Sequence, residues 1–117
     1  MLEDEVKKLV SRMDRDVEAV IVEGRKDEEA MEKAGFTGKV YTCSENTSGL
    51  VSLGRRASRE NSSLAILTDD DEGKKLNREL QEVVPEKINR KIWRKKLGKV
   101  LTSEGRRDVE SINNVID

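Results

Sequence analysis

The chain of 117 residues contains no histidine and a single cysteine, Cys43. Without histidine, catalysis by an imidazole base and zinc sites that depend on histidine are excluded. One cysteine excludes an internal disulfide and a cysteine-rich zinc site. Chemistry that needs imidazole or paired thiols is therefore outside the reach of this sequence.

Aromatic residues and long apolar runs are also scarce. One Trp, one Tyr and one Phe are too few for an aromatic platform that stacks single-stranded bases. No apolar run approaches the roughly 20 residues needed to span a bilayer. Three of the first five residues are acidic, whereas a signal peptide begins with basic residues. We therefore expect a soluble, cytoplasmic protein with no membrane partner.

Charge, in contrast, is abundant. Charged residues make up 40% of the chain and hydrophobic residues 34%, so we expect an adequate but lean core. The formal net charge of −1 hides an asymmetry, because residues 86–107 contain nine basic and two acidic residues. A block of this kind is either a solvated helix face or a contact for the phosphates of a polyanion. The charge pattern alone leaves both interpretations open.

Two short apolar runs each end in carboxylates. Residues 19–22 lead into Glu23 and Gly24, and residues 64–68 lead into the acidic residues 69–72. Apolar runs of this length, bounded by glycine and charge, are typical of strands buried on both faces of a parallel sheet. Ligands of such sheets bind beyond the carboxyl ends of the strands. Both acidic groups would then open into one crevice, and their oxygen ligands favour Mg²⁺ beside a substrate phosphate.

The rest of the chain alternates between helical and extended patterns. We expect strands at residues 18–22, 40–43 and 64–68, with a weak fourth strand near 87–88. Helices are predicted over residues 2–13, from an N-cap at Asp27 to about 34, over 50–60, from 74 to Pro85, over 92–101, and after a cap at Asp108. Strands that alternate with helices at this spacing form a parallel sheet with right-handed crossovers.

These elements predict one compact α/β domain over residues 1–117, with an approximately four-stranded parallel sheet flanked by helices. Residues 1–14 would form the N-terminal helix, and residues 17–88 the sheet core with the metal site. Residues 89–117 would form the basic helix and a short last helix.

The two strand-end motifs, roughly 45 residues apart, resemble the Toprim domain. This metal-binding module occurs in topoisomerases, bacterial-type primases, old-family nucleases, RecR-type repair proteins and the maturase of 5S ribosomal RNA. Its pattern is a glutamate that ends the first strand and an Asp-x-Asp that ends a later one. Residues 20–27 match the first half and residues 66–74 the second, although the loop before Gly73 is one residue tighter than in many relatives. The rest of the chain looks similar to the small, free-standing Toprim proteins of archaea and some bacteria, so the resemblance covers nearly the whole length.

The resemblance implies a Rossmann-like Toprim fold and a role for each acid. Asp69 and Asp71 would hold Mg²⁺, with Mn²⁺ as an alternative ion, directly or through its waters. Asp70 should point away, because neighbours in an extended segment alternate. Glu23 would act as a general acid or base, or as a further metal ligand.

Phosphate contacts are expected around the same crevice. The backbone amides of Gly24 and Gly73 each lead into a helix and can receive a phosphate oxygen. The basic side chains expected to contact phosphates are Arg25, Lys26, Lys74 and Lys75 next to the acidic motifs, and Arg90, Lys91, Arg94 and Lys95 in the basic segment.

The implied function is Mg²⁺-dependent nucleic-acid processing, with nuclease-like phosphodiester or phosphotransfer chemistry on RNA or DNA. The alternative is a non-catalytic Toprim module that binds metal and nucleic acid and acts with partner proteins in a processing complex. A phosphohydrolase for small molecules is a third class. Topoisomerase and primase activities need further domains, and a phosphoreceiver domain would carry its acidic pair after the first strand.

Overall fold

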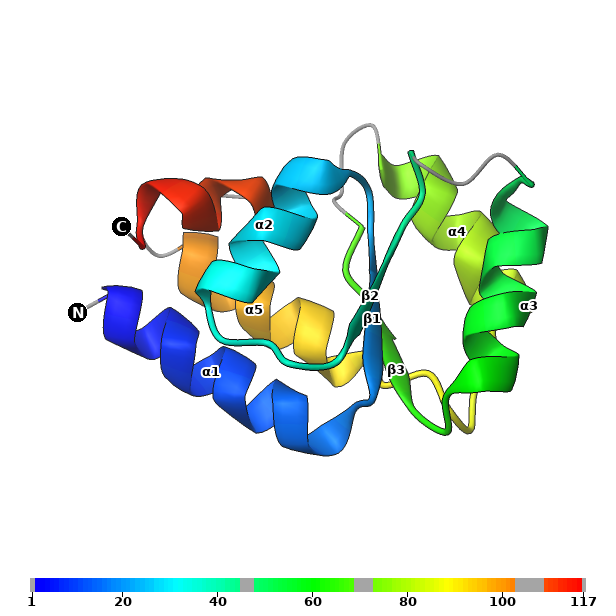
Figure 1. The fold of residues 1–117 in the computed structure, drawn as a ribbon, viewed down its shortest axis with the longest axis horizontal. Helices are drawn as coiled ribbons and strands as arrows, with labels where there is room; N and C mark the ends of the chain where they lie inside the picture. Colours follow the sequence, from blue (N-terminus) through cyan, green and yellow to red (C-terminus); the bar gives the residue numbers. More distant parts are fainter. Residues whose placement is uncertain (1, 45–47, 69–72, 103–108, 117) are drawn as a thin grey trace.

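The computed structural model describes residues 2–44, 48–68, 73–102 and 109–116. A three-stranded parallel sheet lies in the middle of the molecule with helices on both sides (Figure 1). The strands are β1 (Ala19–Val22), β2 (Lys39–Thr42) and β3 (Leu64–Ile66), in the order β2-β1-β3. Because β1 is central, the residue that follows it lies between the ends of the other two strands.

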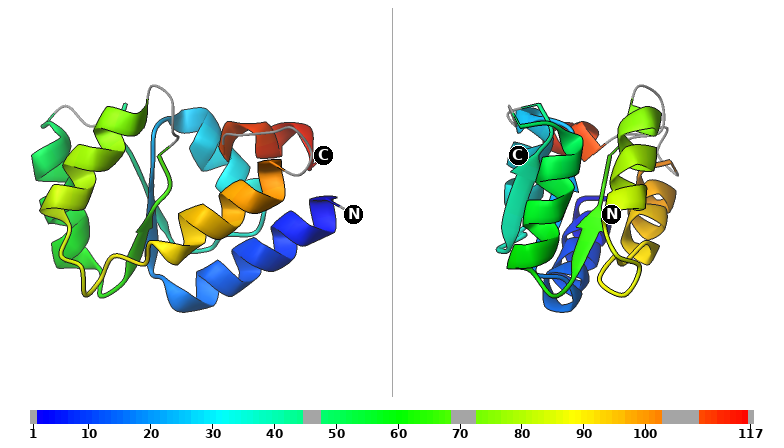
Figure 2. Two further views of the ribbon diagram at one scale, coloured as in Figure 1. Left: turned by 180° about the vertical axis from the view of Figure 1, so that it is seen from behind. Right: turned by 90° about the vertical axis from the view of Figure 1, so that its right-hand side faces the viewer.

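The helices form two unequal layers (Figures 1 and 2). One layer contains α1 (Leu2–Asp16), α2 (Arg25–Lys33), α5 (Ile92–Thr102) and a final 3-10 helix, η1 (Val109–Asn114). The other contains α3 (Leu50–Glu60) and α4 (Gly73–Val83). None of the helices in the described ranges is both long and apolar enough to cross a membrane.

The central strand supplies both halves of the core. Val20 and Val22 belong to the apolar cluster under α1, α2, α5 and η1, whereas Ala19 and Ile21 belong to the cluster under α3 and α4. This division follows from the alternation of side chains along a strand. All four residues have no exposed surface, which confirms the prediction of a strand buried on both faces.

The amino end of the sheet is closed by polar contacts of three acids. Asp14 accepts hydrogen bonds from the backbone N–H groups of Thr37 (2.8 Å) and Gly38 (3.2 Å) and from the Thr37 hydroxyl (2.7 Å). Asp16 accepts from Nε1 of Trp93 (2.6 Å). Glu18 accepts from the N–H of Ser62 (2.6 Å). The bonds of Asp14 and Asp16 join α1 to the loop before β2 and to α5, and the bond of Glu18 joins the link between α1 and β1 to the turn before β3.

The structure corrects two local predictions. The fourth strand near residues 87–88 is reduced to one bridge between Leu64 and Asn89. Residues 86–88 form a turn instead, in which the N–H groups of Ile88 and Asn89 donate to the Pro85 carbonyl. The predicted N-cap, Asp27, lies one turn inside α2, and Gly24 is the N-cap. The Asp27 carboxylate accepts the N–H of Gly24 (2.9 Å) and so caps the helix from its third position. The predicted cap Asp108 lies outside the described residues.

Candidate metal and nucleic-acid site

Glu23 follows the central strand at the carboxyl edge of the sheet. On one side, the N–H of Ser44 donates to the Glu23 carbonyl (2.9 Å), which continues the pairing of β1 with β2. On the other side, the N–H of Leu67 donates to the Ile21 carbonyl (2.8 Å), which continues the pairing with β3. The half-buried Glu23 therefore stands between the ends of both neighbouring strands, where the sequence places it.

The turn after Glu23 is held by Asp27. The backbone N–H of Gly24, a predicted phosphate contact, donates to the Asp27 carboxylate, which is 6% exposed. A phosphate oxygen that reached this amide would have to displace that carboxylate. The start of α2 thus has its own internal anion at the position where helix N-termini commonly receive an external one.

Negative charge at this edge acts on the only cysteine. Burial raises the pKa of the Cys43 thiol to about 11, and the charges of Glu23 and Asp27 contribute to the rise. Cys43 is therefore a protonated thiol at neutral pH and no nucleophile. The carboxylates of Glu23, which follows β1, and of Asp27 on α2 thus both contribute negative charge near the end of β2.

The end of β3 is fixed by two helices. Thr68, the residue before the acidic segment, is fully buried, and its hydroxyl accepts from Nδ2 of Asn77 on α4 (3.0 Å). Its carbonyl accepts from Nε of Arg94 on α5 (2.6 Å). Arg94 therefore lies at the acidic edge, directly beside the residue that precedes the predicted metal ligands. Asp69 and Asp71 themselves, and Asp70 and Glu72, lie outside the described residues.

The other residues of the basic segment that are predicted to contact phosphates are Arg90, Lys91 and Lys95. Arg90 is at the amino end of β3, where its N–H donates to the Leu64 carbonyl and its Nε lies 3.9 Å from Oδ2 of Asp16. Lys91 is exposed, with its Nζ 3.9 Å from Oε1 of Glu86, and Lys95 is exposed on α5. The structure therefore brings Arg94, and not Arg90, to the end of the sheet that carries Glu23.

The basic residues after Glu23 are on the surface. Arg25 is exposed, and the Lys26 side chain, 74% exposed, has its Nζ 3.7 Å from Oε1 of Glu110 on η1. Asn113 of η1 also donates to the Lys26 carbonyl (3.0 Å). Gly73 and Lys74 begin α4. The last helix thus lies against the start of α2, a contact that sequence patterns did not suggest.

Thr68 and Asn77 were also absent from the predicted site. The sequence does contain a signal for Thr68, because a threonine at the end of a buried apolar strand needs a hydrogen-bond partner for its hydroxyl. An asparagine inside a helix, where it is a poor helix former, is a suitable candidate for that partner. Sequence alone does not join the two residues.

The donor set fits the expected ion. The predicted ligands are carboxylates with no nitrogen donor, which suits a hard divalent cation. Within the described residues, no three acidic or cysteine side chains are grouped closely enough to hold a metal. Of the predicted metal ligands, Glu23 is the one that lies within the described residues.

Comparison with known families resolves the assignment. The family model of the Toprim domain matches residues 18–100, more than two thirds of the chain. The chain belongs to the Toprim family. The Toprim match spans both acidic motifs and most of α5, but not α1 or η1. No curated protein and no solved structure matches the chain.

Toprim membership establishes the general class. Toprim domains bind divalent metal ions such as Mg²⁺ and occur in proteins that process nucleic acids. Family membership places this protein in that general class. The compact α/β architecture with its parallel sheet agrees with a Toprim fold, as the sequence predicts, although three strands are formed rather than four.

Proposed function

We propose that this Toprim protein carries out Mg²⁺-dependent phosphodiester or phosphotransfer chemistry on RNA or DNA at the carboxyl edge of its sheet. The observation that carries the proposal is the position of Glu23. It ends the central strand, between the ends of both neighbours, in surroundings whose negative charge acts on Cys43. This is the edge at which open α/β sheets bind their ligands.

The family pattern implies a role for each acidic residue. Glu23, Asp69 and Asp71 would hold Mg²⁺, and Mn²⁺ would serve in its place. The bound ion would neutralise charge on a phosphate and orient the attacking oxygen. Glu23 would either exchange a proton with the reacting oxygen or remain a ligand only. The basic residues around this edge would position the substrate.

Arg94 has the best-defined place among those basic residues. Its Nε–H is held by the Thr68 carbonyl, so the guanidinium has a fixed position next to the acidic segment. A guanidinium stays charged and carries further N–H donors that suit phosphate oxygens. Arg94 would contact the phosphate nearest the metal. The exposed Arg25, Lys26, Lys91 and Lys95 would contact phosphates farther along the strand, together with Lys74.

The deciding experiment is incubation of labelled, structured RNA and DNA with the protein in Mg²⁺, in Mn²⁺ and in chelator. Cleavage or phosphoryl transfer is expected with either metal and not with chelator. Glu23→Gln should eliminate turnover while nucleic acid still binds. Glu29→Gln, at an exposed position of α2, is the matched control and should keep full activity.

Two outcomes would redirect the proposal. Turnover that survives Glu23→Gln would contradict the acid–base role of this residue and point to a contaminating nuclease. Tight, salt-sensitive binding without turnover in any metal would favour the alternative, a non-catalytic module that acts with partner proteins.

A further inference from the structure

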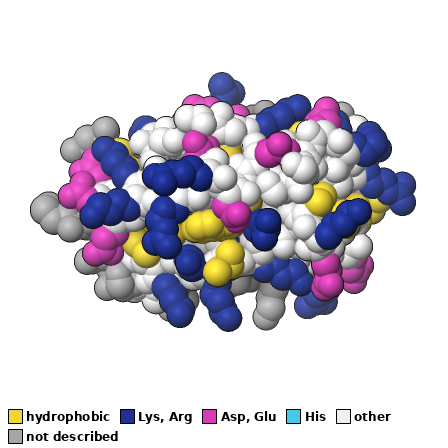
Figure 3. Space-filling view, turned by 90° about the horizontal axis from the view of Figure 1, so that it is seen from below, with side chains coloured by type: hydrophobic (Ala, Val, Ile, Leu, Met, Phe, Trp, Pro, Cys, Tyr) yellow, Lys and Arg dark blue, Asp and Glu magenta, His cyan; other side chains and the backbone are white. Residues whose placement is uncertain are grey.

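The basic surface of this protein is not confined to α5. Seen from below, Lys and Arg side chains appear over the α1 and α5 side of the molecule and also over the α3 side (Figure 3). We infer that the outer face of α3 and the adjoining amino end of β2 bind the phosphate backbone of a nucleic acid, on the opposite layer from α5. We call this the α3 surface and define it by Lys39, Arg55, Arg56 and Arg59. The choice of nucleic acid as the ligand rests on the proposed function.

The charge of this surface is nearly all of one sign. All four basic side chains are exposed, and Glu60 is the one acid in α3. Among the ion pairs of the described residues, Lys39 with Glu60 (3.2 Å) is the pair that involves this surface. One carboxylate against four cations leaves an excess of positive charge along the helix.

Folding does not require these arginines. α3 packs through Leu53, Gly54 and Ala57, which are buried, whereas Arg55 and Arg59 lie one turn apart on the exposed side. Like charges at this spacing destabilise a helix by about 0.2–0.5 kcal/mol per pair. A helix that keeps such a pair without an intervening acid is better suited to an anionic ligand than to its own stability.

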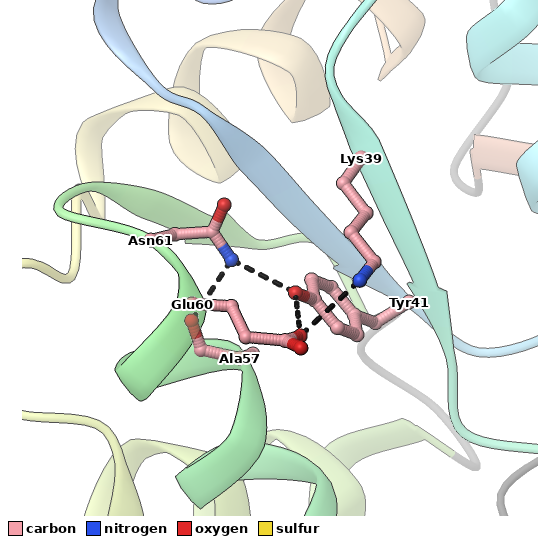
Figure 4. Close-up of polar contacts among 5 residues, drawn as sticks. All are labelled: Lys39, Tyr41, Ala57, Glu60 and Asn61. Carbon is pink, nitrogen blue, oxygen red and sulfur yellow. Dashed lines mark hydrogen bonds and ion pairs between the residues drawn. The ribbon is translucent and has the colours of Figure 1, made fainter.

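Two of the cations are held in place before any ligand arrives. Nζ of Lys39 lies 4.9 Å from the centroid of the Tyr41 ring, and the Arg56 guanidinium lies 5.7 Å from it. The ring itself is fixed (Figure 4), because the Tyr41 hydroxyl donates to Glu60 (2.6 Å) and accepts from Nδ2 of Asn61 (2.9 Å). Side chains ordered in advance lose less entropy on binding, so this cluster offers a phosphate two prepositioned cations.

The α3 surface is also continuous with the proposed active edge. β2 ends at the same edge as β1, and α3 begins at that level and runs back along the sheet toward its amino end (Figure 1). A strand that leaves the crevice past β2 would therefore meet Arg55 and Arg56 before Arg59. The α3 surface would hold nucleic acid on the side of the sheet that α5 does not reach.

A single charge reversal on the α3 surface can weaken nucleic-acid binding without lowering the stability of the fold. Arg55→Glu removes a contact and places a glutamate four residues before Arg59, a favourable pair on a helix. Lys8→Glu is a closely matched control, because Lys8 and Arg12 are exposed basic residues at the same spacing on α1. Both variants change the net charge equally and should melt at or above the temperature of the unaltered protein.

The readout is the anisotropy of labelled RNA and DNA oligonucleotides, titrated with the full chain at several salt concentrations. Arg55→Glu should raise the Kd at least about fivefold more than Lys8→Glu and should lower the salt slope by about one, the value of one phosphate contact. Replacement of Arg55, Arg56 and Arg59 together by Gln should lower that slope by about two or three.

Two results would overturn the inference without overturning the proposed function, and a third would overturn both. If Arg55→Glu and Lys8→Glu bind alike, or if the triple variant keeps the original slope, the α3 surface does not contact nucleic acid, while metal-dependent turnover can still stand. If the unaltered protein neither binds nor cleaves any nucleic acid, the proposed function fails and the inference fails with it.

Discussion

The two ends of the parallel sheet use acidic residues in opposite ways. At the amino end, Asp14, Asp16 and Glu18 accept hydrogen bonds that join α1 and the link after it to the loops before β2 and β3 and to α5. At the carboxyl end, the charges of Glu23 and Asp27 raise the pKa of a neighbouring thiol, and the acidic motif follows β3. The same residue types therefore stabilise the fold at one end and create a negative potential at the other.

This contrast separates structural acids from functional ones. An acid that accepts several short hydrogen bonds stabilises the fold, because its loss leaves donors without partners. Carboxylates that contribute to one local negative potential repel one another, and a bound cation relieves that repulsion. Asp27 belongs to both groups, because its carboxylate also accepts the N–H of Gly24 and caps α2. Substitutions at the amino end should therefore lower stability, and substitutions at the carboxyl end should alter chemistry.

The largest effect is expected at Gly38, where the loop at the amino end approaches β1. A Cβ at this position would lie 2.4 Å from the Glu18 carbonyl and 2.7 Å from the Phe36 ring. Because the backbone would have to move, Gly38→Ala should lower the free energy of unfolding by about 3 kcal/mol, measured in urea. Gly98→Ala is the control, since a Cβ there meets nothing within 4 Å and the helix should gain stability. If Gly38→Ala and Gly98→Ala changed the free energy of unfolding equally, the close approach of Gly38 to the Glu18 carbonyl would be refuted.

A smaller loss is expected at Asp16. Asp16→Ala removes the acceptor of the Trp93 indole N–H, so the free energy of unfolding should fall by about 1–2 kcal/mol. Trp93 is the only tryptophan, and its fluorescence should change because its hydrogen bond is lost. Glu32→Ala, at an exposed position of α2, should change neither measurement. An unaltered emission spectrum in Asp16→Ala would show that this contact does not persist in solution.

At the carboxyl end, removal of a charge should leave stability nearly unchanged. Glu23→Gln should shift the free energy of unfolding by no more than about 0.5 kcal/mol, or should raise it, as substitutions at functional sites often do. Ile66→Ala provides the scale, because truncation of a buried isoleucine costs about 2–5 kcal/mol. A loss in Glu23→Gln as large as in Ile66→Ala would mean that Glu23 is a structural acid.

The smallest effect concerns the reactivity of Cys43. Since the charge of Glu23 contributes to its raised pKa, Glu23→Gln should lower that pKa and speed alkylation at pH 9 a few-fold. The rate for the unaltered protein should keep rising toward pH 11. Stability should fall over the same interval, because a group whose pKa is raised by folding loses its contribution as the pH rises through the folded value. Glu29→Gln should alkylate at the unaltered rate.

The strands were predictable because burial on both faces leaves an uninterrupted apolar run. β1 and β3 have no exposed residue, and their positions differ from the prediction by one or two residues. α3 matches its predicted bounds, and α1 continues three residues beyond the prediction. The weak apolar signal at Ile88 belongs to the core under α3 and α4 and not to a strand, a distinction that depends on tertiary packing.

The site was predictable as far as it depends on strand ends. The place of Glu23 follows from topology, because the residue after a central parallel strand lies between its neighbours' ends. The separation of Arg90 from Arg94 does not follow from the charge pattern. Arg90 belongs to the bridge that pairs with Leu64, whereas the first turn of α5 directs Arg94 to Thr68, 26 residues earlier in the chain. Contacts across such distances in sequence require the fold.

The hydrophobic core of the molecule extends beyond the segment that matches the Toprim family model. The Toprim match begins at residue 18 and ends at residue 100, yet the apolar cluster under α2 is completed from both flanks. α1 and the region of η1 contribute Val6, Leu9, Val10, Met13, Val109, Ile112 and Ile116 to it. A chain trimmed to the matched segment would remove these side chains from the cluster that also contains Val20, Met31 and Leu97. The Toprim sheet therefore depends on flanking sequence for part of its protection from water.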